Sequence, residues 1–454
     1  MDQRFFSDIG MALDTAGVLR QRSRFSSAGQ GDLASWFAVT DLAVASIGAA
    51  GAELQALADE TNETAITVDR RLASLWFGMS IQPQGWELPS IWDPVAGDYP
   101  TRDGWIRLHT NAPHHRAAAL SVLGVGVDRE AVARAVATWD GLALEHAVVE
   151  AGGCAAFMMT LEHWQQHPQG RAVASEPLIH WHEAGTIAPK ALSGHAAAPL
   201  SGLRVLDLTR VLAGPVAGRF LAAYGADVLR IDPPSWDEPA VVPEVTLGKR
   251  CAGLDLTLPE DRARFEGLAA EADILLHGYR PGALAGLGLD ADTLRKRNPT
   301  LIEVTLCAYG WTGPWAGRRG FDSLVQMSSG IAAEGMRRAG ANRPVPLPVQ
   351  ALDHAAGYLL AASALRALRH RASSGRVLTA KVSLARTAAF LIPSLRGEAG
   401  PGMAKAGESD LAAGIETTDW GAARRVRFPL RLDAIAPSWP YPATKLRSKP
   451  AVWR

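Results

Sequence analysis

The sequence is poor in cysteine. Its three cysteines, Cys154, Cys251 and Cys307, lie far apart along the 454 residues. This spacing excludes a disulfide framework and a thiolate zinc site, which both need closely spaced cysteines. A reducing compartment is the usual location of such a chain, so we expect a cytoplasmic protein.

Long apolar runs and an excess of charge are also missing. No run approaches the roughly 20 apolar residues that span a bilayer, and the start, MDQRFFSDIGMALD, lacks the basic-then-apolar pattern of a signal peptide. The 46 basic and 46 acidic side chains cancel. Because no net charge attracts the chain to nucleic acid or to an anionic membrane, we expect neither as a partner.

The composition is otherwise typical of a folded protein. The hydrophobic fraction of 48% and the charged fraction of 20% exclude a disordered, collagen-like or coiled-coil chain. Gly, Pro and small residues replace periodic apolar positions at 183–199, which predicts a linker. We therefore expect three segments, with bounds 1–195, 196–395 and 396–454, the last of them rich in Gly and Pro and extended.

The middle segment alternates between short apolar runs and helical patterns. Helices are also expected at 37–59 and 129–151 in the first segment. Strands that alternate with helices predict an α/β fold, in which helices cover both faces of a mostly parallel sheet. The expected strands are 203–208, 227–231, 252–256, 274–276, 301–306 and 377–382, and the expected helices are 215–224, 259–272, 290–297 and 353–370.

Gly214 and Gly218 lie between the first strand and the first helix of this pattern. At such a turn, backbone amides and a helix N-terminus can hold a phosphate group. The spacing differs from the GxGxxG pattern of nicotinamide dinucleotide sites, so another nucleotide-containing ligand or simple packing glycines are both open. Asp232, at the end of the next strand, stands where a ribose-binding acid would lie.

The sequence gives little support for a metal site or for a serine hydrolase. His114 with His115 and His180 with His182 are close pairs, but neither has the i, i+4 spacing that brings two imidazoles to one side of a helix. No GxSxG motif is present. We expect no metal site.

Asp353 is the one carboxylate at the start of an otherwise apolar helical segment, VQALDHAAGYLLAASALRAL. It could be an N-terminal cap, worth about 1 kcal/mol. It could equally be a nucleophile that the helix N-terminus holds ionised, with Gly357 one turn further on. The residues alone leave both interpretations open.

Five ordered segments together resemble the class III CoA-transferases, the CaiB/BaiF family. They cover about 196–390 and are PLSGLRVLDLTRVLAGPVAGRFLAAYGADVLRIDPP, GKRCAGLDLTLPEDR, ADILLHGYRPGALAGLGLD, NPTLIEVTLCAYGWTGPWAGRRGFDSLVQMSSGIA and QALDHAAGYLLAASALRAL. The resemblance implies an open, Rossmann-like sheet that binds CoA and a smaller α+β domain that covers it.

The implied activity is transfer of CoA from an acyl-CoA to a carboxylic acid acceptor. Asp353 matches the family's nucleophile, which forms a mixed anhydride and then an aspartyl-CoA thioester. CoA would be substrate and carrier, with no permanently bound cofactor. The family's CoA contacts fall on Val211, Leu212, Ala213, Leu254, Gly278, Tyr279 and Arg319.

Some positions depart from the family pattern. Leu212 stands where close relatives often have glutamine, Gly278 where they have asparagine, and Pro233 where an arginine often meets a CoA phosphate. These changes keep a non-catalytic CoA-binding homologue open. Leu212 and the tryptophans suggest an apolar or branched acyl chain.

Two other enzyme classes remain as alternatives. In the related α-methylacyl-CoA racemases a histidine carries the second proton, and this position is Phe321 here, which cannot carry one; a transferase is therefore favoured. An unrelated dinucleotide oxidoreductase would instead be protected by NAD(P) against thermal unfolding.

The first segment resembles the later part of the same family. FAVTDLAVASIGAAGAEL, around Asp41, is similar to the segment around Asp353, and ITVDRR is similar to AKVSLA at 380–385. The segments after these two resemble the family's small domain. We expect a rearranged partial duplication, with Asp41 as a relic or a cap, and either an interlocked homodimer or a monomer that mimics one.

Overall fold

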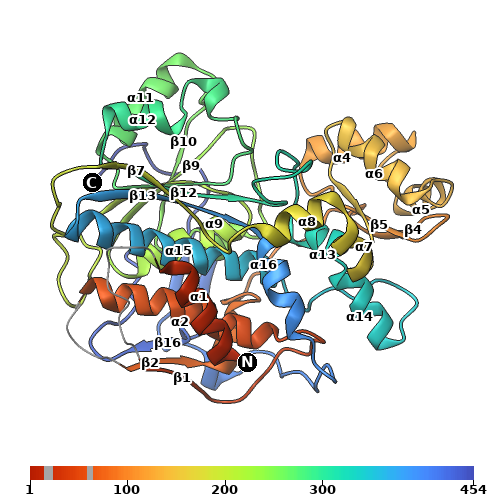
Figure 1. Cartoon of the computed structure of the whole chain (residues 1–454), viewed down its shortest axis with the longest axis horizontal. Helices are drawn as coiled ribbons and strands as arrows, with labels where there is room; N and C mark the ends of the chain where they lie inside the picture. The colour runs from red at the N-terminus through yellow and green to blue at the C-terminus, as the bar shows by residue number, and fades with distance from the viewer. Residues whose placement is uncertain (15–23, 59–64) are drawn as a thin grey trace.

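A seven-stranded sheet lies at the centre of the computed structural model, which describes residues 1–14, 24–58 and 65–454 (Figure 1). The strand order is β10-β9-β8-β11-β12-β13-β7, and all neighbours are parallel except β13 and β7. This confirms the predicted α/β class with an open, mostly parallel sheet. The strands are β7 (His180–Thr186), β8 (Arg204–Leu208), β9 (Asp227–Asp232), β10 (Arg250–Gly253), β11 (Ile274–His277), β12 (Ile302–Cys307) and β13 (Arg376–Ser383).

Helices cover both faces of this sheet, because its strands are apolar on both sides. Val205 and Leu206 are neighbours in β8 and enter different hydrophobic cores. On one face lie α11 and α12, and on the other lie α9 and α15 (Figure 1). The helices of this part are α9 (Ala213–Ala223), α10 (Val242–Val245), α11 (Pro259–Glu271), α12 (Ala291–Arg297), α15 (Ala351–Ser373) and α16 (Leu384–Leu391), with 3₁₀ turns η1 (Ala285–Leu287) and η2 (Ile392–Ser394).

One predicted strand is displaced. The structure places β10 two residues earlier than the expected 252–256, because Arg250 pairs with Leu229 of β9. Leu254 and Leu256 are buried in the core beyond the strand and produced the apolar pattern. Burial of these two leucines therefore comes from packing and not from strand pairing.

A smaller α+β unit lies beside the sheet, as the family resemblance implied (Figure 1). Its antiparallel strands β4, β5 and β6 and helices α4–α6 enclose a separate core. The elements of this region are β4 (Gly97–Pro100), β5 (Trp105–Leu108), α4 (Pro113–Leu123), α5 (Arg129–Val136), α6 (Gly141–Glu150), β6 (Ala155–Phe157), α7 (Leu161–Gln166), α8 (Pro168–Ser175), α13 (Asp322–Ser328) and α14 (Ile331–Ala339).

The single helix expected at 129–151 is two helices. The chain turns at Asp140, whose backbone is extended, between α5 and α6. Because of this turn, both helices direct apolar side chains such as Val132 and Leu144 into the same core.

Segments 1–195 and 396–454 form strand pairs with other parts of the chain. β7 lies before the expected boundary at 195 and runs into the first residues of the predicted linker 183–199, yet it forms an edge of the central sheet. The C-terminal segment 396–454 is largely extended and pairs with the beginning of the chain, since β15 pairs with β3 and β16 with β2. The remaining elements are α1 (Asp2–Leu13), β1 (Arg24–Ala28), α2 (Val39–Ala58), β2 (Ala65–Asp69), α3 (Arg70–Trp76), β3 (Ile81–Pro83), η3 (Glu408–Asp410), β14 (Glu416–Thr418), β15 (Gly421–Arg425) and β16 (Leu430–Leu432).

The long helix α15 is buried along most of its length and packs against α2 and α9. Glu53 of α2 accepts hydrogen bonds from Arg366 at 2.8 Å and from Arg369 at 3.2 Å. All three side chains are at least nine-tenths buried. These ion pairs therefore join the N-terminal segment to the helix that carries Asp353.

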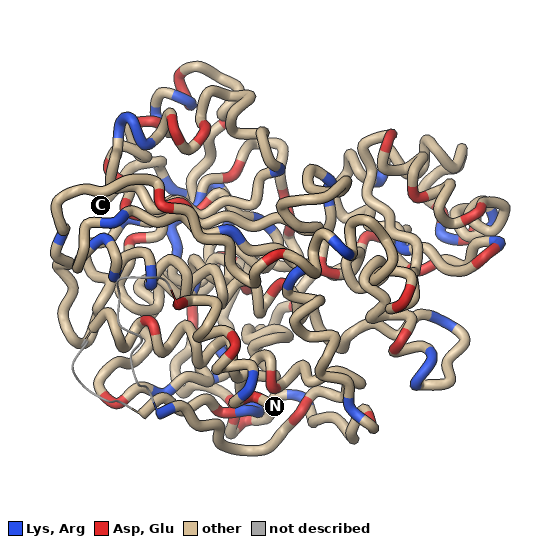
Figure 2. Tube along the Cα trace, in the orientation of Figure 1, with Lys and Arg blue, Asp and Glu red and all other residues tan. Residues whose placement is uncertain are grey.

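Acidic and basic residues are mixed along all parts of the chain trace (Figure 2). Within the three described ranges, no helix combines the length and the apolar character needed to cross a membrane.

Replacing Glu53 with Ala is expected to destabilise the fold by about 3–5 kcal/mol, because it leaves the buried Arg366 guanidinium without its carboxylate. Urea unfolding monitored by circular dichroism measures the change. Glu130→Ala is the matched control, since Glu130 is exposed and its pair with Arg134 is worth less than about 1 kcal/mol. Equal small effects of the two substitutions would contradict the structural importance of the α2–α15 ion pairs.

Candidate functional site

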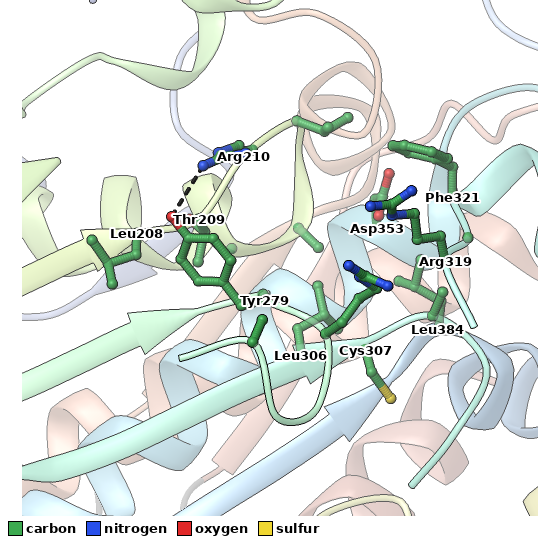
Figure 3. A pocket seen from close by; sticks show the side chains of 18 of the residues that line it. Leu208, Thr209, Arg210, Tyr279, Leu306, Cys307, Arg319, Phe321, Asp353 and Leu384 are labelled. Carbon is green, nitrogen blue, oxygen red and sulfur yellow. Dashed lines mark hydrogen bonds between the residues drawn. The ribbon is translucent and has the colours of Figure 1, made fainter. Parts of the chain in front are cut away.

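A cavity of about 540 Å³ opens where the central strands end. Its walls are the loops after β8, β11 and β12, the start of α15, and α4 of the smaller unit (Figure 3). In open α/β sheets, ligands bind at the carboxyl ends of the strands, and this cavity has that position. Its side chains include Arg210, Val211, Trp236, Tyr279, Arg319, Phe321, Asp353, His114 and His115.

Most of the residues predicted from the sequence meet here. Leu212 and Leu254 do not line the cavity: Leu212 is buried beside it, and Leu254 packs into the core behind the sheet. The side chains at these two positions therefore face other protein atoms. The predicted residues that line the cavity are Val211, Ala213, Gly278, Tyr279, Arg319 and Asp353.

The loop after β8 has an unusual backbone. Val211 has φ +63°, a conformation that β-branched residues avoid, and its N–H donates to Glu238 Oε2 at 2.9 Å. The next residues begin α9, whose N-terminus has no side-chain cap. Strain of this kind, held by a buried partner beside a cavity, is typical of a ligand-binding loop.

The two glycines of this loop have different roles. Gly214 lines the cavity, and a Cβ there would lie 2.2 Å from Thr209. Gly218 was expected to face phosphate as well, but a Cβ there would lie 2.6 Å from Asp207 Oδ2 and 2.9 Å from Lys249 Nζ. Gly218 is therefore a packing glycine that makes room for the buried ion pair of Lys249 and Asp207.

Asp232 is not a ribose-binding acid in this structure. It is fully buried and accepts two hydrogen bonds from Arg230, at 2.9 and 3.0 Å. Its place at the end of β9 suggested the ribose role, but the inward-facing arginine occupies both of its oxygens.

At one end of the cavity the predicted Tyr279 lies beside Arg210, Trp236 and Arg280, which the sequence patterns did not reveal. Arg210 donates to the Tyr279 hydroxyl at 3.0 Å, and its guanidinium lies 4.7 Å from the ring centre of Trp236 (Figure 3). Arg280 also lines this end. Arg210 and Arg280 each directly adjoin a predicted contact, which is the signal that could have revealed them.

At the other end, Asp353 lies in the first turn of α15 and is 7% exposed. Its backbone N–H donates to Asp322 Oδ2 at 2.9 Å. Asp322 therefore accepts a free N–H of the first turn of α15, and Asp353 is not the N-terminal cap. Burial and the nearby Asp322 raise the pKa of Asp353 well above its usual value, and burial raises the pKa of Asp322 to about 6. Burial therefore opposes ionisation of Asp353, whereas the helix N-terminus was expected to favour it.

Phe321 lines the same cavity and stacks on His109, with ring centres 3.7 Å apart. A phenyl ring thus stands where the racemase pattern has its histidine. Asp41, the counterpart of Asp353 in the sequence, lies away from the cavity and is paired with Arg70, at 3.1 Å, and with Arg396. In the described part of the chain, no group of three or more His, Cys, Asp or Glu is arranged to hold a metal ion.

Asp353→Asn is expected to stabilise the protein, and more so as the pH rises. Both carboxyls have raised pKa values in the folded state, so above about pH 4 the folded state binds more protons than the unfolded one, and stability falls as pH rises. The uncharged amide of the variant removes this loss of stability. We therefore expect the free energy of unfolding to rise by about 1 kcal/mol or more near neutral pH and to change little at about pH 4.

Urea unfolding of both proteins at the two pH values measures this difference. Asp433→Asn, a change of an exposed carboxylate, should shift neither midpoint. Equal stability of Asp353→Asn and the unchanged protein at neutral pH would argue against a buried carboxyl pair.

Comparison with known proteins places this site in a family. Residues 200–416 match the model of CoA-transferase family III. A probable fatty acyl-CoA transferase of Mycobacterium tuberculosis is 36% identical over 197 residues, which is 40% of this chain and 50% of that protein. A succinate–glutarate CoA-transferase of Agrobacterium fabrum is 35% identical over 196 residues, 39% of this chain and 48% of that protein.

Among solved structures, a CaiB/BaiF family protein of Brucella suis is 26% identical, with a TM-score of 0.38 and coverage of 50% of this chain and 65% of that one. The chain spans about half the length of the two curated relatives named above. The match over residues 200–416, slightly less than half of the chain, and the two curated relatives therefore assign this part of the chain to CoA-transferase family III.

Proposed function

We propose that the protein transfers CoA from an acyl-CoA to a carboxylic acid, with Asp353 as the nucleophile. The observation that carries this proposal is that the Asp353 carboxyl lines the cavity at the strand ends, together with the loop after β8. Membership of the family supports the reaction class, and the scarcity of cysteine agrees with an enzyme of the cytoplasm.

The reaction begins when the ionised Asp353 carboxylate attacks the thioester carbonyl carbon. The C–S bond breaks, the CoA thiolate leaves, and an acyl–aspartyl anhydride forms. The thiolate then attacks the aspartyl carbonyl carbon, which releases the donor acid as a carboxylate and leaves an aspartyl-CoA thioester.

The acceptor carboxylate repeats these steps in reverse order. It attacks the aspartyl thioester and expels the thiolate, which then attacks the acceptor's carbonyl carbon in the new anhydride. Acceptor acyl-CoA leaves and the Asp353 carboxylate is regenerated, so all bonds and charges balance. Each attack builds negative charge on a carbonyl oxygen, and the uncapped N–H groups at the start of α9 are suitable donors for it.

The raised pKa of Asp353 serves this chemistry. A carboxylate that is poorly solvated and close to a second acid is a more basic nucleophile than one in water. The positive side chains of the cavity favour the anionic CoA ester, with Arg210, Tyr279 and Trp236 as the group best suited to its nucleotide part. Neither a metal nor a redox cofactor is required in any step.

We also propose that the small domain that covers the CoA-binding sheet comes from residues 1–195 of the same chain, as a partial duplication would allow. The order α2–β2–α3 repeats the order α15–β13–α16, and Asp41 is the third residue of α2 as Asp353 is of α15. In this proposal residues 1–195 contain the rearranged copy, residues 196–395 bind CoA, and Asp41 is a relic fixed by its ion pairs.

Asp353→Ala is expected to lower acyl exchange by about 1,000-fold or more, because the covalent route is lost, while CoA affinity stays nearly unchanged. Exchange is measured by mass spectrometry of the acyl-CoA products formed from mixed acyl-CoAs and acids. Asp41→Asn is the matched control and should retain exchange, since Asp41 lies outside the cavity.

Trapping tests the intermediate separately. Hydroxylamine added during exchange should convert the activated aspartyl carbonyl to a hydroxamate, which peptide mass spectrometry would locate at Asp353. Full exchange by the Asp353→Ala variant would overturn the nucleophile, and CoA binding without any exchange in the unchanged protein would favour a non-catalytic homologue.

A further inference from the structure

Glu238 is a carboxylate that lies behind the end of the cavity formed by Arg210 and Tyr279. It belongs to the loop after β9, and its side chain does not line the cavity. Three donors meet on it: the Val211 backbone N–H at 2.9 Å, the Trp236 indole N–H at 3.0 Å, and the Arg230 guanidinium. A carboxylate can satisfy all three because its two oxygens only accept hydrogen bonds and offer about four lone-pair sites.

The position of this carboxylate is set by the protein core. Arg230 on β9 is fully buried and also donates to Asp232 at 2.9 and 3.0 Å. It contacts Oε1 of Glu238, which leaves Oε2 for Val211 and Trp236. The acceptor that Val211 meets is therefore fixed from the sheet and does not depend on the loop after β8.

Val211 is the residue whose backbone needs such support. Its φ of +63° is costly for a β-branched side chain. The residue Thr209 is held within its own segment, since its N–H donates to Asp207 Oδ1 at 2.9 Å. Leu212 is held by the first turn of α9, because its carbonyl accepts the Val216 N–H at 2.9 Å. Between these residues, Val211 donates to a carboxylate of another loop.

The conformation of Val211 decides where the cavity's cation lies. Arg210 directly precedes it, and the Arg210 guanidinium is 4.7 Å from the ring centre of Trp236 and 5.2 Å from that of Tyr279. Figure 3 shows the hydrogen-bonded Arg210 and Tyr279 apart from Asp353, which belongs to α15. A change of the Val211 backbone would therefore displace Arg210 and leave the candidate nucleophile in place.

We propose that Glu238 is a positioning residue, which holds the loop after β8 in the strained conformation that binds CoA. This inference rests on the proposed transferase function and names the group that preorganises its CoA site. Without the carboxylate, the loop would relax to an ordinary φ, and CoA would bind only the fraction of molecules that still has the strained loop. The apparent affinity falls by that fraction, while the bound complex stays the same.

Net charge alone predicts the opposite effect. Removing a negative charge near the cavity should strengthen the binding of an anion such as CoA. Glu238→Gln keeps the size of the side chain, but its NH₂ group cannot accept a hydrogen bond from Arg230 or from Val211. Weaker CoA binding by this variant would therefore reveal lost positioning and not altered charge.

Calorimetric titration with CoA measures the affinity. We expect Glu238→Gln to weaken CoA binding about 10-fold or more, because the strained loop is then a minor conformation. The kcat of acyl exchange at saturating acyl-CoA should stay within about 2-fold, since bound ligand restores the loop. Asp237→Asn is the matched control and should leave CoA affinity unchanged. Asp237 is exposed in the same loop, and asparagine keeps the oxygen that accepts the Glu238 N–H.

Val211→Gly tests the route through the backbone. Glycine adopts a φ of +63° without strain. In a Val211→Gly background, Glu238→Gln should therefore weaken CoA binding only about 3-fold or less. Val211→Gly by itself should raise the urea midpoint of unfolding, and a lower midpoint would contradict the strain even if Glu238→Gln did not fold.

Equal CoA affinity of Glu238→Gln and the unchanged protein would overturn the positioning role and leave the transferase proposal intact. An equal loss of affinity in the two backgrounds would assign Glu238 to Trp236 or to overall folding, and would also overturn it. Failure of the unchanged protein to bind CoA would refute the proposed function itself.

Discussion

Burial of α15 along nearly its whole length determines how the other elements pack. All residues from 351 to 371 of this helix are buried, including its charged ones. Here α2, α9 and the strands β12 and β13 surround it. Its polar residues must then find partners within the protein, and Glu53 supplies one for Arg366 while Asp273 supplies one for Arg371. The first and middle parts of the chain are thereby held together.

The same packing positions the candidate nucleophile. Gly357, one turn after Asp353, lets α9 approach so closely that a Cβ would lie 2.4 Å from the Ala213 carbonyl oxygen. The N-terminus of α9 and the carboxyl of Asp353 therefore meet at one cavity. Asp322 then occupies the start of α15, and the burial of two neighbouring carboxyls gives Asp353 its raised pKa. The chemistry proposed for the site thus depends on how tightly the two helices pack.

Local patterns in the sequence predicted much of this fold. Strands such as Arg204–Leu208 and Asp227–Asp232 are short apolar runs bounded by turn residues, and the alternation with helices indicated a parallel sheet. The edge strand His180–Thr186 was missed, because it is largely polar and exposed and is paired only with β13. The partners of the C-terminal segment were missed for a similar reason, since strand pairing between distant segments leaves no local pattern.

For the site, sequence patterns predicted the loops after β8 and β11, which contain Val211 and Tyr279. The family resemblance added Asp353, which lies in the first turn of α15. The packed structure was needed to show that Gly218 makes room for the Lys249–Asp207 ion pair and that Asp232 is paired with Arg230. It also shows that His115, from the smaller unit, lines the cavity. The order of residues along the chain sets the composition of each loop at a strand end. Ionisation, burial and pairing depend on neighbours that are distant in the chain, and these are defined only when the helices and sheets have packed.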